Sequence, residues 1–366
     1  MNFLITTIPG DMHAAVVSCE LRSRGHRVSM IYGEDYPARQ CASIRVKRTL
    51  DHEDAVTAQS RLELGDFDVV WNRRRIAFSL PDNTHPDDRK FANNKLRAFT
   101  TNLWNHISPA AFWVNPLLEA LRANQKPYQL ATAKLCGFDI PETLFSNDPD
   151  EIRYFLRQHG KVVYKSFMPA FWGGENSFRS LFTTLVDDRI VSDDMALKAC
   201  PGIYQQYIKP VCEVRITVFG VNMYALKHTI SSASTSVDSR AGHLDGFESE
   251  IYDIPSDLRQ KVLDLMARMN IRFGCLDILV LENGRYVFLE INEAGQFLWL
   301  EELQPSMPML ESFCSYLEQS SDRYAHSNVD VSASMAKWRD HSDVKAILAR
   351  EHHIGSAPLP SLYLSM

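Results

Sequence analysis

The sequence lacks the features that mark several large protein classes. None of its seven cysteines lies in a C-x-x-C pair, which argues against a zinc knuckle and a disulfide framework. The formal net charge is -6, so the chain has no basic excess for binding nucleic acid. No apolar run reaches the ~20 residues of a membrane span, and residues 1–17 carry no basic flank typical of an export signal. These absences predict a soluble cytoplasmic protein that binds neither nucleic acid nor membranes.

The sequence also lacks the short motifs of several enzyme classes. It has no G-x-x-x-x-G-K phosphate loop, no H-E-x-x-H zinc motif and no G-x-S-x-G nucleophile elbow. The first expected strand-to-helix turn, TTIPGDMH at residues 6–13, differs from the G-x-G-x-x-G dinucleotide fingerprint. His352 and His353 are adjacent near the end of the sequence, and we interpret them as an exposed pair rather than as metal ligands.

The length and composition are those of a globular protein with two or three domains. The chain has 366 residues, of which 45% are hydrophobic and 23% are charged. Its first segment alternates expected strands at 2–7, 26–32 and 67–75 with a helix at 12–25. This alternation is typical of a parallel sheet with right-handed crossovers, so we expect an N-terminal parallel α/β domain.

The pattern changes at about residue 115, where a new unit is expected. Residues 115–149 are helical and then extended, with Pro141 as a break. An expected strand ends at Lys165, and the glycine-containing segment 167–177 follows it. We expect four units, an N-terminal domain at 1–114, a central domain at 115–200, a C-terminal domain at 201–325 and a helical or loose tail at 326–366.

A hairpin is expected around Asn283 and Gly284, because both residues accept the positive φ of a two-residue type I′ turn. Counting outwards from that turn predicts three pairs, Leu281 with Tyr286, Leu279 with Phe288, and Asp277 with Glu290. Two carboxylates then face each other, and Asn292 lies on the same face because strand side chains alternate.

Two readings of this hairpin stay open. Facing carboxylates are destabilising without a compensating cation. Asp277, Glu290 and Asn292 offer three oxygen ligands, the donors that a hard ion such as Mg²⁺ prefers, while the nitrogen and sulfur donors of zinc are missing. The alternative is two structural ion pairs, Asp277 with an arginine and Glu290 with a lysine.

Other charged residues are weak candidates when taken singly. Lys165 ends a β-branched strand and has the simpler interpretation of an edge-strand lysine. Glu213 and Arg215 share one strand face, which is also typical of a cross-strand salt bridge. Lys126 would by default be an exposed helix lysine.

In this order, these residues resemble the ATP-grasp ligase superfamily over residues 115–302. The resemblance implies an α/β (α+β) fold in which central and C-terminal domains enclose ATP. It implies that Lys126 and Lys165 bind phosphates and that Glu213 binds the ribose. It also implies that Gln205 and Gln206 face the adenine amine, with the backbone of Tyr207 and Ile208 at the ring edge. Asp277, Glu290 and Asn292 match the ligands of two Mg²⁺ ions, and Arg215 matches the arginine that neutralises the transferring phosphate.

Within the superfamily, the sequence is most similar to the graspetide, or microviridin-type, macrocyclases and to the related ribosomal-protein glutamate ligases. Four segments carry this narrower resemblance, residues 69–75, 123–149, 234–240 and 291–301. The sequence departs from the group where Ser239 precedes Arg240 in place of a frequent tryptophan, and where Glu293-Ala294 replaces Asn-Pro. The resembling family is often homodimeric, which implies a homodimer here.

The resemblance implies a ligase that activates a carboxylate with ATP as an acyl phosphate, which a hydroxyl or amine then attacks. The expected partner is a ribosomal precursor peptide or a peptide-like substrate. Two alternatives stay open, a ligase that adds free amino acids and a non-catalytic nucleotide-binding scaffold. Arg240 would hold the substrate carboxylate, or be an exposed loop arginine. Arg73, Arg74 and Arg75 would dock an acidic peptide side chain, or form a solvated basic patch. The segment 167–177, with Gly173 and Gly174, would close over the triphosphate, or be a simple turn.

Overall fold

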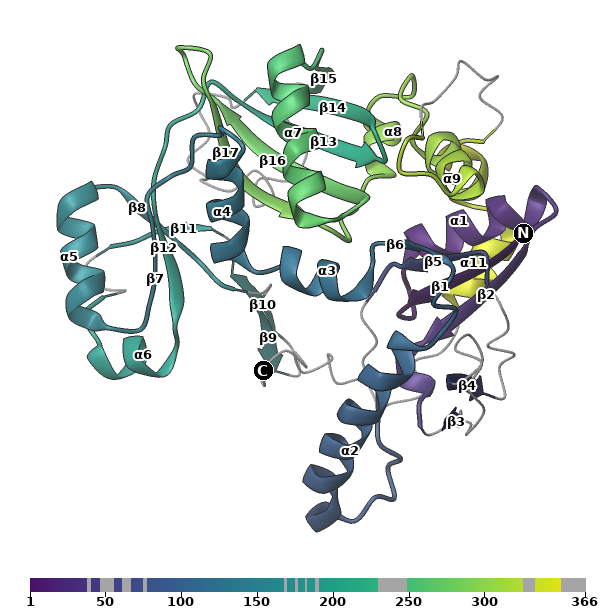
Figure 1. The fold of residues 1–366 in the computed structure, drawn as a ribbon. Coiled ribbons are helices and arrows are strands. Elements are labelled where there is room, and N and C mark those ends of the chain that lie inside the picture. Colours follow the sequence, from purple (N-terminus) through teal and green to yellow (C-terminus); the bar gives the residue numbers. More distant parts are fainter. Residues whose placement is uncertain are drawn as a thin grey trace.

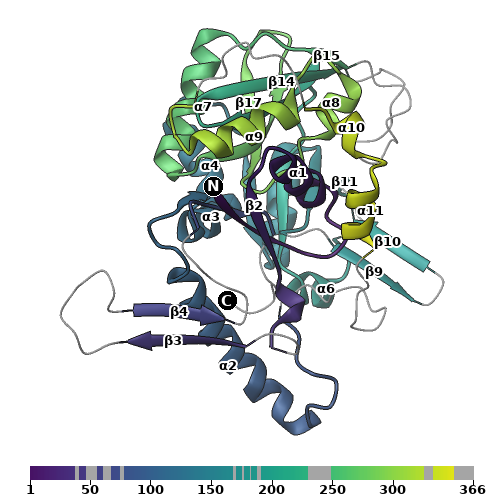
Figure 2. The same cartoon turned by 90° about the vertical axis from the view of Figure 1, so that its right-hand side faces the viewer.

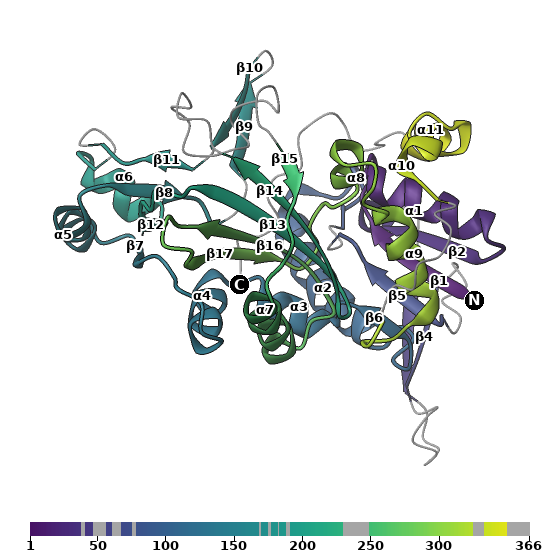
Figure 3. The same cartoon turned by 90° about the horizontal axis from the view of Figure 1, so that it is seen from above.

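The computed structural model shows three main sheets side by side, each with its own helices (Figure 1). The described residues are 1–37, 41–46, 56–60, 67–74, 78–167, 170–174, 177–181, 183–187, 191–229, 249–324 and 333–349. Seen from above, the N-terminal, C-terminal and central sheets form a row, with the C-terminal sheet in the middle (Figure 3). Within the described ranges, no helix is both long and apolar enough to cross a membrane.

The N-terminal sheet is parallel throughout, which confirms the predicted α/β start. Its strand order is β2-β1-β5-β6, with bounds β1 Asn2–Thr7, β2 Arg27–Tyr32, β5 Val69–Asn72 and β6 Phe112–Val114. The crossover helix α1 (Met12–Ser23) begins where the Asp11 side chain accepts a hydrogen bond of 3.2 Å from the Ala14 amide. The helix is buried along almost all of its length, so it fixes the end of β1 firmly in the core.

Several smaller elements extend from this sheet. The antiparallel pair β3 (Ala42–Val46) and β4 (Val56–Ser60) and the helix α2 (Pro86–Asn105) project away from the three sheets (Figure 2). A short 3-10 turn, η1 (Gly33–Asp35), follows β2. They lie apart from the C-terminal sheet, which carries five of the expected site residues, Glu213, Arg215, Asp277, Glu290 and Asn292.

The central sheet is antiparallel and has the order β11-β8-β12-β7. Its elements are β7 Thr143–Ser146, α5 Pro149–His159, β8 Val162–Lys165, β11 Thr184–Leu185, α6 Asp194–Ala199 and β12 Gly202–Gln206. Gly202 is required beneath an aromatic ring, because a Cβ there would lie 2.2 Å from the Tyr164 ring. β9 (Ala170–Gly174) and β10 (Ser177–Leu181) form a separate antiparallel pair, so the glycines of the expected loop lie in a strand.

The C-terminal sheet has the order β15-β14-β13-β16-β17. Its strands are β13 Cys212–Phe219, β14 Asn222–Thr229, β15 Ser249–Ile251, β16 Phe273–Val280 and β17 Tyr286–Asn292. One face packs against α4 (Lys126–Leu135) and α7 (Ser256–Met269), and α3 (Leu117–Ala123) lies beside these helices. Because the odd-numbered residues of β13 point away from this apolar layer, the opposite face receives the polar side chains.

The hairpin between β16 and β17 differs from the prediction in its turn and in its nearest pairs. The Gly284 amide donates to Leu281 O and the Leu281 amide donates to Arg285 O, which leaves three loop residues rather than two. Gly284 has φ +76°, whereas Asn283 does not have the positive φ that a type I′ turn needs. The predicted pairs of Leu281 with Tyr286 and Leu279 with Phe288 are therefore wrong. The observed pairs are Val280 with Tyr286, Leu279 with Val287 and Ile278 with Phe288.

A bulge corrects the register before the carboxylates are reached. The register shifts between Asp277 and Ile278, so that Asp277 pairs with Glu290 as predicted. The shift keeps Ile278 and Phe288 in the apolar layer and turns Glu290 to the polar face. Core packing therefore restores the facing carboxylates although the turn is of another type.

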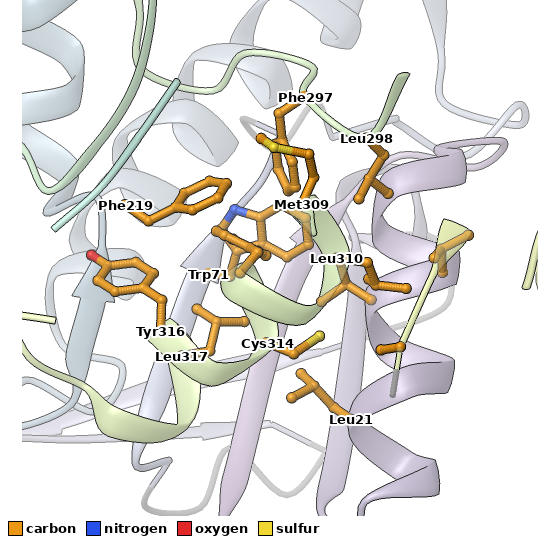
Figure 4. Close-up of a cluster of buried hydrophobic side chains, with 14 of the residues drawn as sticks. Leu21, Trp71, Phe219, Phe297, Leu298, Met309, Leu310, Cys314, Tyr316 and Leu317 are labelled. Atoms are coloured by element: carbon orange, nitrogen blue, oxygen red, sulfur yellow. The ribbon is translucent and has the colours of Figure 1, made fainter. Parts of the chain in front are cut away.

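The remaining helices join the N-terminal and C-terminal sheets through one shared core. They are α8 Trp299–Leu303, α9 Met309–Gln319, α10 Met335–Trp338 and α11 Ser342–Leu348. Figure 4 shows Tyr316 and Leu317 of α9 in one cluster of buried side chains with Trp71 of β5 and Phe219 of β13. On the same helix, the ring of Phe313 lies 4.8 Å from that of Trp71 and 5.2 Å from that of Phe219. α10 and α11 pack against α1, so the described part of the expected tail is folded (Figure 2).

Candidate functional site

Three of the expected site residues form one row across the C-terminal sheet. Arg215 of β13 pairs with Asp277 of β16, which pairs with Glu290 of β17. Because directly paired residues point to the same face, the three side chains project together from the polar side of the sheet. Glu213 and Asn292 lie two residues along their strands and point to that face as well. The structure thus brings five expected residues onto one surface.

Each carboxylate of this row has a cationic partner. Arg215 Nη1 donates to Asp277 Oδ1 at 2.7 Å, and Lys126 Nζ donates to Glu290 Oε2. The two acidic side chains keep 35% and 32% of their surface exposed. Burial alone would lower the pKa of Arg215, but Asp277 and neighbouring acceptors raise it. These are the ion pairs of the alternative interpretation, and their exposure leaves both carboxylates accessible.

The donors in the row suit an oxygen-coordinated cation. Asn292 is exposed and its Oδ1 accepts a 3.0 Å hydrogen bond from the Ala294 amide, which orients the side-chain oxygen. Within the described ranges, no three His, Cys, Asp or Glu residues gather as a metal site. Two carboxylates and one amide oxygen fit Mg²⁺, which keeps several waters and takes few protein ligands. An incoming Mg²⁺ would compete with Lys126 for Glu290.

Helix α4 supplies two side chains to β17, the outer strand of the sheet. Lys126 is the first helical residue, and Gln129 follows one turn later on the same face. Gln129 is fully buried, with Nε2 donating to Ile291 O at 2.8 Å and Oε1 accepting from the Ile291 amide at 3.1 Å. It therefore replaces a neighbouring strand between the two expected ligands, Glu290 and Asn292. We did not predict this role, although a glutamine one helical turn from Lys126 was visible in the sequence.

The central sheet presents Lys165 from the end of β8. Lys165 Nζ donates to Gln205 Oε1 at 2.8 Å, and Gln205 Nε2 donates to Thr143 Oγ1 at 2.9 Å. These side chains share one face of the sheet, opposite the face of Tyr204, which packs with α5 and α6. Lys165 is therefore aimed by a buried glutamine and is not an edge-strand lysine, because β8 lies between β11 and β12.

The four residues expected at the adenine, residues 205–208, do not all lie on the face that carries Lys165. Gln206 follows Gln205 on β12, so its side chain points to the opposite face. The Tyr207 amide donates to Lys161 O at 2.9 Å, so this amide is bonded within the protein. Ile208 follows directly and is half-buried. The structure therefore brings Gln205, but not Gln206, to Lys165.

His228 is a further residue of the polar face, and we did not predict it. It pairs with Glu213 across β13 and β14, and its ring stacks on Trp299 with centroids 5.9 Å apart. His228 Nδ1 and Ser249 Oγ are 2.8 Å apart. Burial lowers the pKa of His228, with Asp277 opposing this effect and Arg215 adding to it, so the ring is neutral at pH 7. The only sequence signal was its alternation with the strand residues around it.

The N-terminal arginines correct one expectation. Arg73 is fully buried, its Nε lies 3.2 Å from Asp11 Oδ2, and its Nη1 donates to Ala294 O. It cannot dock an acidic peptide side chain, because no part of it reaches the surface. Arg74 Nε also lies 3.0 Å from Asp11 Oδ2, and Arg75 lies outside the described residues.

Burial shifts the pKa values of Arg73 and Asp11 in opposite directions. Burial lowers the pKa of Arg73 to about 10, which leaves it charged at pH 7. Burial would raise the pKa of Asp11, but Arg73, Arg74, His13 and the Ala14 amide together lower it. Asp11 therefore stays ionised and holds both arginines.

Two expected elements cannot be placed. Arg240 and the segment 234–240 lie outside the described residues. The side chains of β9 and β10 are also outside the described part, so the expected closing role of Gly173 and Gly174 stays a prediction.

Comparisons with known proteins bear on the fold of the chain. No protein-family model matches the chain. The chain is similar to a curated glutathione synthetase of Rhodopseudomonas palustris (strain ATCC BAA-98 / CGA009), with 28% identity over 164 residues. This match covers 43% of the chain and 46% of the relative, so the chain spans less than half the length of that relative.

Solved structures match over most of the chain. The macrocyclase MdnC of Microcystis aeruginosa MRC, bound with precursor peptide MdnA, has TM-score 0.72 and 24% identity, covering 87% of this chain and 100% of its own. A RiPP-associated ATP-grasp ligase of Chryseobacterium gregarium, in complex with ADP and a leader and core peptide, has TM-score 0.73 and 24% identity, with coverages of 87% and 97%. The ATP-grasp ligase PsnB, complexed with a phosphomimetic minimal precursor variant, Mg and ADP, has TM-score 0.64 and 19% identity, with coverages of 87% and 98%. This likeness confirms the predicted ATP-grasp fold.

Proposed function

We propose that this chain, which has the ATP-grasp fold, is an ATP- and Mg²⁺-dependent ligase. It activates a carboxylate as an acyl phosphate and joins it to a hydroxyl or amine, with ADP and phosphate as the other products. The favoured substrate is a ribosomally made precursor peptide, on which the reaction forms ester or amide crosslinks. The three matching structures described above, each in complex with a precursor or a leader and core peptide, support that choice of substrate.

One observation carries the proposal. Arg215, Asp277 and Glu290 form a charged row on one sheet face, and Lys126 closes it at the end of Glu290. A phosphoryl group in transfer carries negative charge that must be neutralised, and positioned cations supply most of the catalysis. Bound Mg²⁺ would supply further positive charge to neutralise the phosphates. Asp277, Glu290 and Asn292 are the residues that would hold it.

The reaction needs no covalent enzyme intermediate. A substrate carboxylate oxygen attacks the γ-phosphorus of ATP, and ADP leaves. The nucleophile then attacks the acyl carbon, loses its proton and expels phosphate, so the peptide loses one water in total. Lys126, Lys165 and Arg215 would bind the phosphate oxygens. We further propose that Gln205 and the Tyr207 carbonyl lie at the adenine and that Glu213 binds the ribose.

A second candidate function follows from the curated relative. Its name, glutathione synthetase, favours a ligase that joins free amino acids or adds residues to a peptide end. The same charged row would serve this reaction, because it acts on the phosphate rather than on the substrate. The two candidates differ in product mass.

Three coarser features belong to the same proposal. We propose the four predicted units as the domain division, with the boundary between the second and third units placed after Gln206 instead of after residue 200, because β12 belongs to the central sheet. The units are then 1–114, 115–206, 207–325 and 326–366. We also propose a homodimer that acts in the cytoplasm, where ATP is available. Light scattering of the purified protein tests the dimer through its mass.

The experiment incubates the protein with ATP, Mg²⁺ and a candidate precursor peptide, and follows peptide mass and ADP. Loss of one water per linkage together with ADP formation supports the macrocyclase. A gain of residue mass supports the second candidate, and the absence of ADP with every peptide and amino acid supports a non-catalytic scaffold. Short peptides rich in Thr, Ser or Lys and in Asp or Glu, encoded beside this protein, are the first substrates to test.

A further inference from the structure

The segment after β17, residues 293–298, is held by buried polar side chains from far earlier in the chain. His13 Nε2 accepts hydrogen bonds from the Phe297 amide at 3.0 Å and from the Leu298 amide at 3.1 Å. His13 is 8% exposed and its ring packs edge-on against Phe297 at 5.2 Å. Because Nε2 accepts both bonds, the ring proton must lie on Nδ1. His13 thus fixes the far end of the segment.

Two more side chains hold the near end of the segment. Arg73 Nη1 donates to Ala294 O. Asn115 Nδ2 donates to Glu293 O at 2.9 Å and to Phe273 O at 2.8 Å, while its Oδ1 accepts from the Arg272 and Phe273 amides at 2.6 and 2.9 Å. Asn115 is 2% exposed. It therefore ties the segment to the start of β16, the strand that carries Asp277.

The held segment is continuous with the charged row. Asn292 Oδ1 accepts from the Ala294 amide, and Asn292 O accepts from the Gly295 amide at 3.2 Å. Arg215 Nη2 donates to Gln296 O at 3.4 Å. At Gly295 a Cβ would lie 2.6 Å from Cys275 Sγ and 3.2 Å from Arg215 Nη2, so the segment lies directly against both. Moving the segment would displace Asn292 and Arg215 together.

Burying Arg73 costs more free energy than burying an apolar side chain of similar size, so a purely structural role does not explain it. Within the described residues, its Nε and Nη2 have no hydrogen-bond partner of good geometry, although Nε lies close to Asp11. A buried cation with unsatisfied nitrogens costs free energy that an apolar side chain of similar size would avoid. Its contact with Ala294 gives it a role that an apolar side chain could not fill.

We propose that His13, Arg73 and Asn115 are positioning residues of the ligase site, because they hold residues 293–298 so that Asn292 and Arg215 keep their places around metal and phosphate. All three side chains are buried. The inference rests on the proposed function, since it assigns these residues to the site that would bind Mg²⁺ and nucleotide. It joins the N-terminal domain to the chemistry of the C-terminal sheet.

The test compares two replacements of the same residue. His13→Gln keeps an acceptor atom near the position of Nε2, whereas His13→Leu removes it and keeps an apolar volume. Calorimetry measures ADP affinity over a series of Mg²⁺ concentrations for each purified variant. We expect His13→Leu to raise the Mg²⁺ needed for half-maximal ADP binding about 10-fold, the low end of the usual cost of losing an outer-shell partner. His13→Gln is expected to stay within about 2-fold of the original protein.

A matched control separates positioning from stability. Trp338 Nε1 donates to Glu20 Oε2 at 2.6 Å near the other end of α1, so Trp338→Phe weakens the packing of the same helix without contacting residues 293–298. It is expected to lower Tm and to leave the Mg²⁺ dependence unchanged. If His13→Leu behaves like this control, the residue is only structural and the proposal is overturned.

A second variant keeps the test decisive if His13→Leu does not fold. Arg73→Met removes the bond to Ala294 but leaves Asp11 paired with Arg74, and buried ion pairs often tolerate apolar replacements. It should raise the Mg²⁺ requirement as His13→Leu does, and an unchanged requirement would contradict the proposal.

Hydrogen exchange distinguishes failure of this inference from failure of the proposed function. The Phe297 and Leu298 amides should exchange faster in His13→Leu than in His13→Gln, whether or not nucleotide binds. Equal rates would show that His13 does not hold the segment. If the original protein binds no ADP at any Mg²⁺ concentration, the proposed function fails, and the role assigned to these residues at that site fails with it.

Discussion

Two of the protein's arginine–aspartate pairs, Arg215 with Asp277 and Arg73 with Asp11, have the same residue types and differ in environment. Arg215 and Asp277 lie 2.7 Å apart with 35% of the aspartate side chain exposed, whereas Arg73 and Asp11 lie 3.2 Å apart with 5% of the aspartate exposed. The first pair faces a second carboxylate and a lysine on an open sheet face. The second is enclosed where the N-terminal domain meets the segment 293–298. Exposure therefore separates a charge available for chemistry from one that holds the fold together.

The largest expected effect is on catalysis at the exposed row. Glu290→Gln keeps the size of the side chain but removes one charge of the expected metal site. Losing several kcal/mol of charge stabilisation should lower ADP formation roughly 1,000-fold. Glu282→Gln, in the exposed turn of the same hairpin, is the control and should retain full activity. Substantial activity of Glu290→Gln would reduce the row to structural ion pairs.

We expect an aspartate-to-asparagine substitution to cost more stability at Asp11 and more activity at Asp277. Asp11→Asn leaves the buried Arg73 uncompensated and should lower the free energy of unfolding by about 3 kcal/mol. Asp277→Asn should lower it by about 1 kcal/mol, because a partly exposed pair contributes little. Activity should follow the reverse order once both proteins are folded. Denaturant unfolding with an ADP assay measures both, and equal losses of stability would break the distinction.

The enclosed junction also predicts a dependence of stability on pH. Burial, together with Arg73, lowers the pKa of His13 from 6.5 to about 3 in the folded state. Between about pH 6.5 and pH 3, His13 is therefore protonated in the unfolded chain and neutral in the folded chain. The stability that the neutral, buried His13 contributes is fully present above pH 6.5 and is lost as the pH falls towards 3. The loss approaches about 1.4 kcal/mol per pH unit. Urea unfolding at several pH values should show a flatter dependence for His13→Gln, and parallel curves would contradict the assignment.

The smallest expected effect sharpens the geometry of the hairpin that carries Glu290. Gly284 has φ +76°, so Gly284→Ala should cost about 1 kcal/mol of stability. Asn283→Ser should cost about 0.5 kcal/mol or less, because Asn283 does not need a positive φ in a three-residue loop. Thermal unfolding measures both variants. Equal costs would favour the two-residue turn.

The pairing of Asp277 with Glu290 was predicted correctly, although the predicted turn was wrong, because a bulge offsets the longer loop. Asn283-Gly284 fits two turn types, and the sequence around the turn does not separate them. The structure has the longer loop, and a bulge restores Asp277 opposite Glu290. Phe288 packs in the core against Phe138, which lies 150 residues earlier in the chain, with ring centroids 5.7 Å apart. This packing keeps Phe288 in the apolar layer and so favours the bulge. The alternation of strand residues and the apolar Phe288 could be read from the local sequence. The long-range packing that favours the bulge could not.

The sequence predicted, as one alternative, an arginine partner for Asp277 and a lysine partner for Glu290, but it did not identify which residues these are, because they come from distant segments. Lys126 and Gln129 reach β17 from helix α4. By default Lys126 was an exposed helix lysine, and no role was predicted for Gln129. Arg73 was expected to be accessible because it follows a strand as part of an arginine run. The apolar residues before it, including the buried Trp71, were a signal that the strand end continues into the core.

The most direct test is a crystal structure with ADP and Mn²⁺, whose anomalous signal locates a metal that replaces Mg²⁺. The account predicts Mn²⁺ at about 2.2 Å from carboxylate oxygens of Asp277 and Glu290, with the Asn292 side chain beside it and Lys126 moved from Glu290 to a phosphate oxygen. Lys126 still paired with Glu290, with ADP bound and no metal on the row, would contradict it.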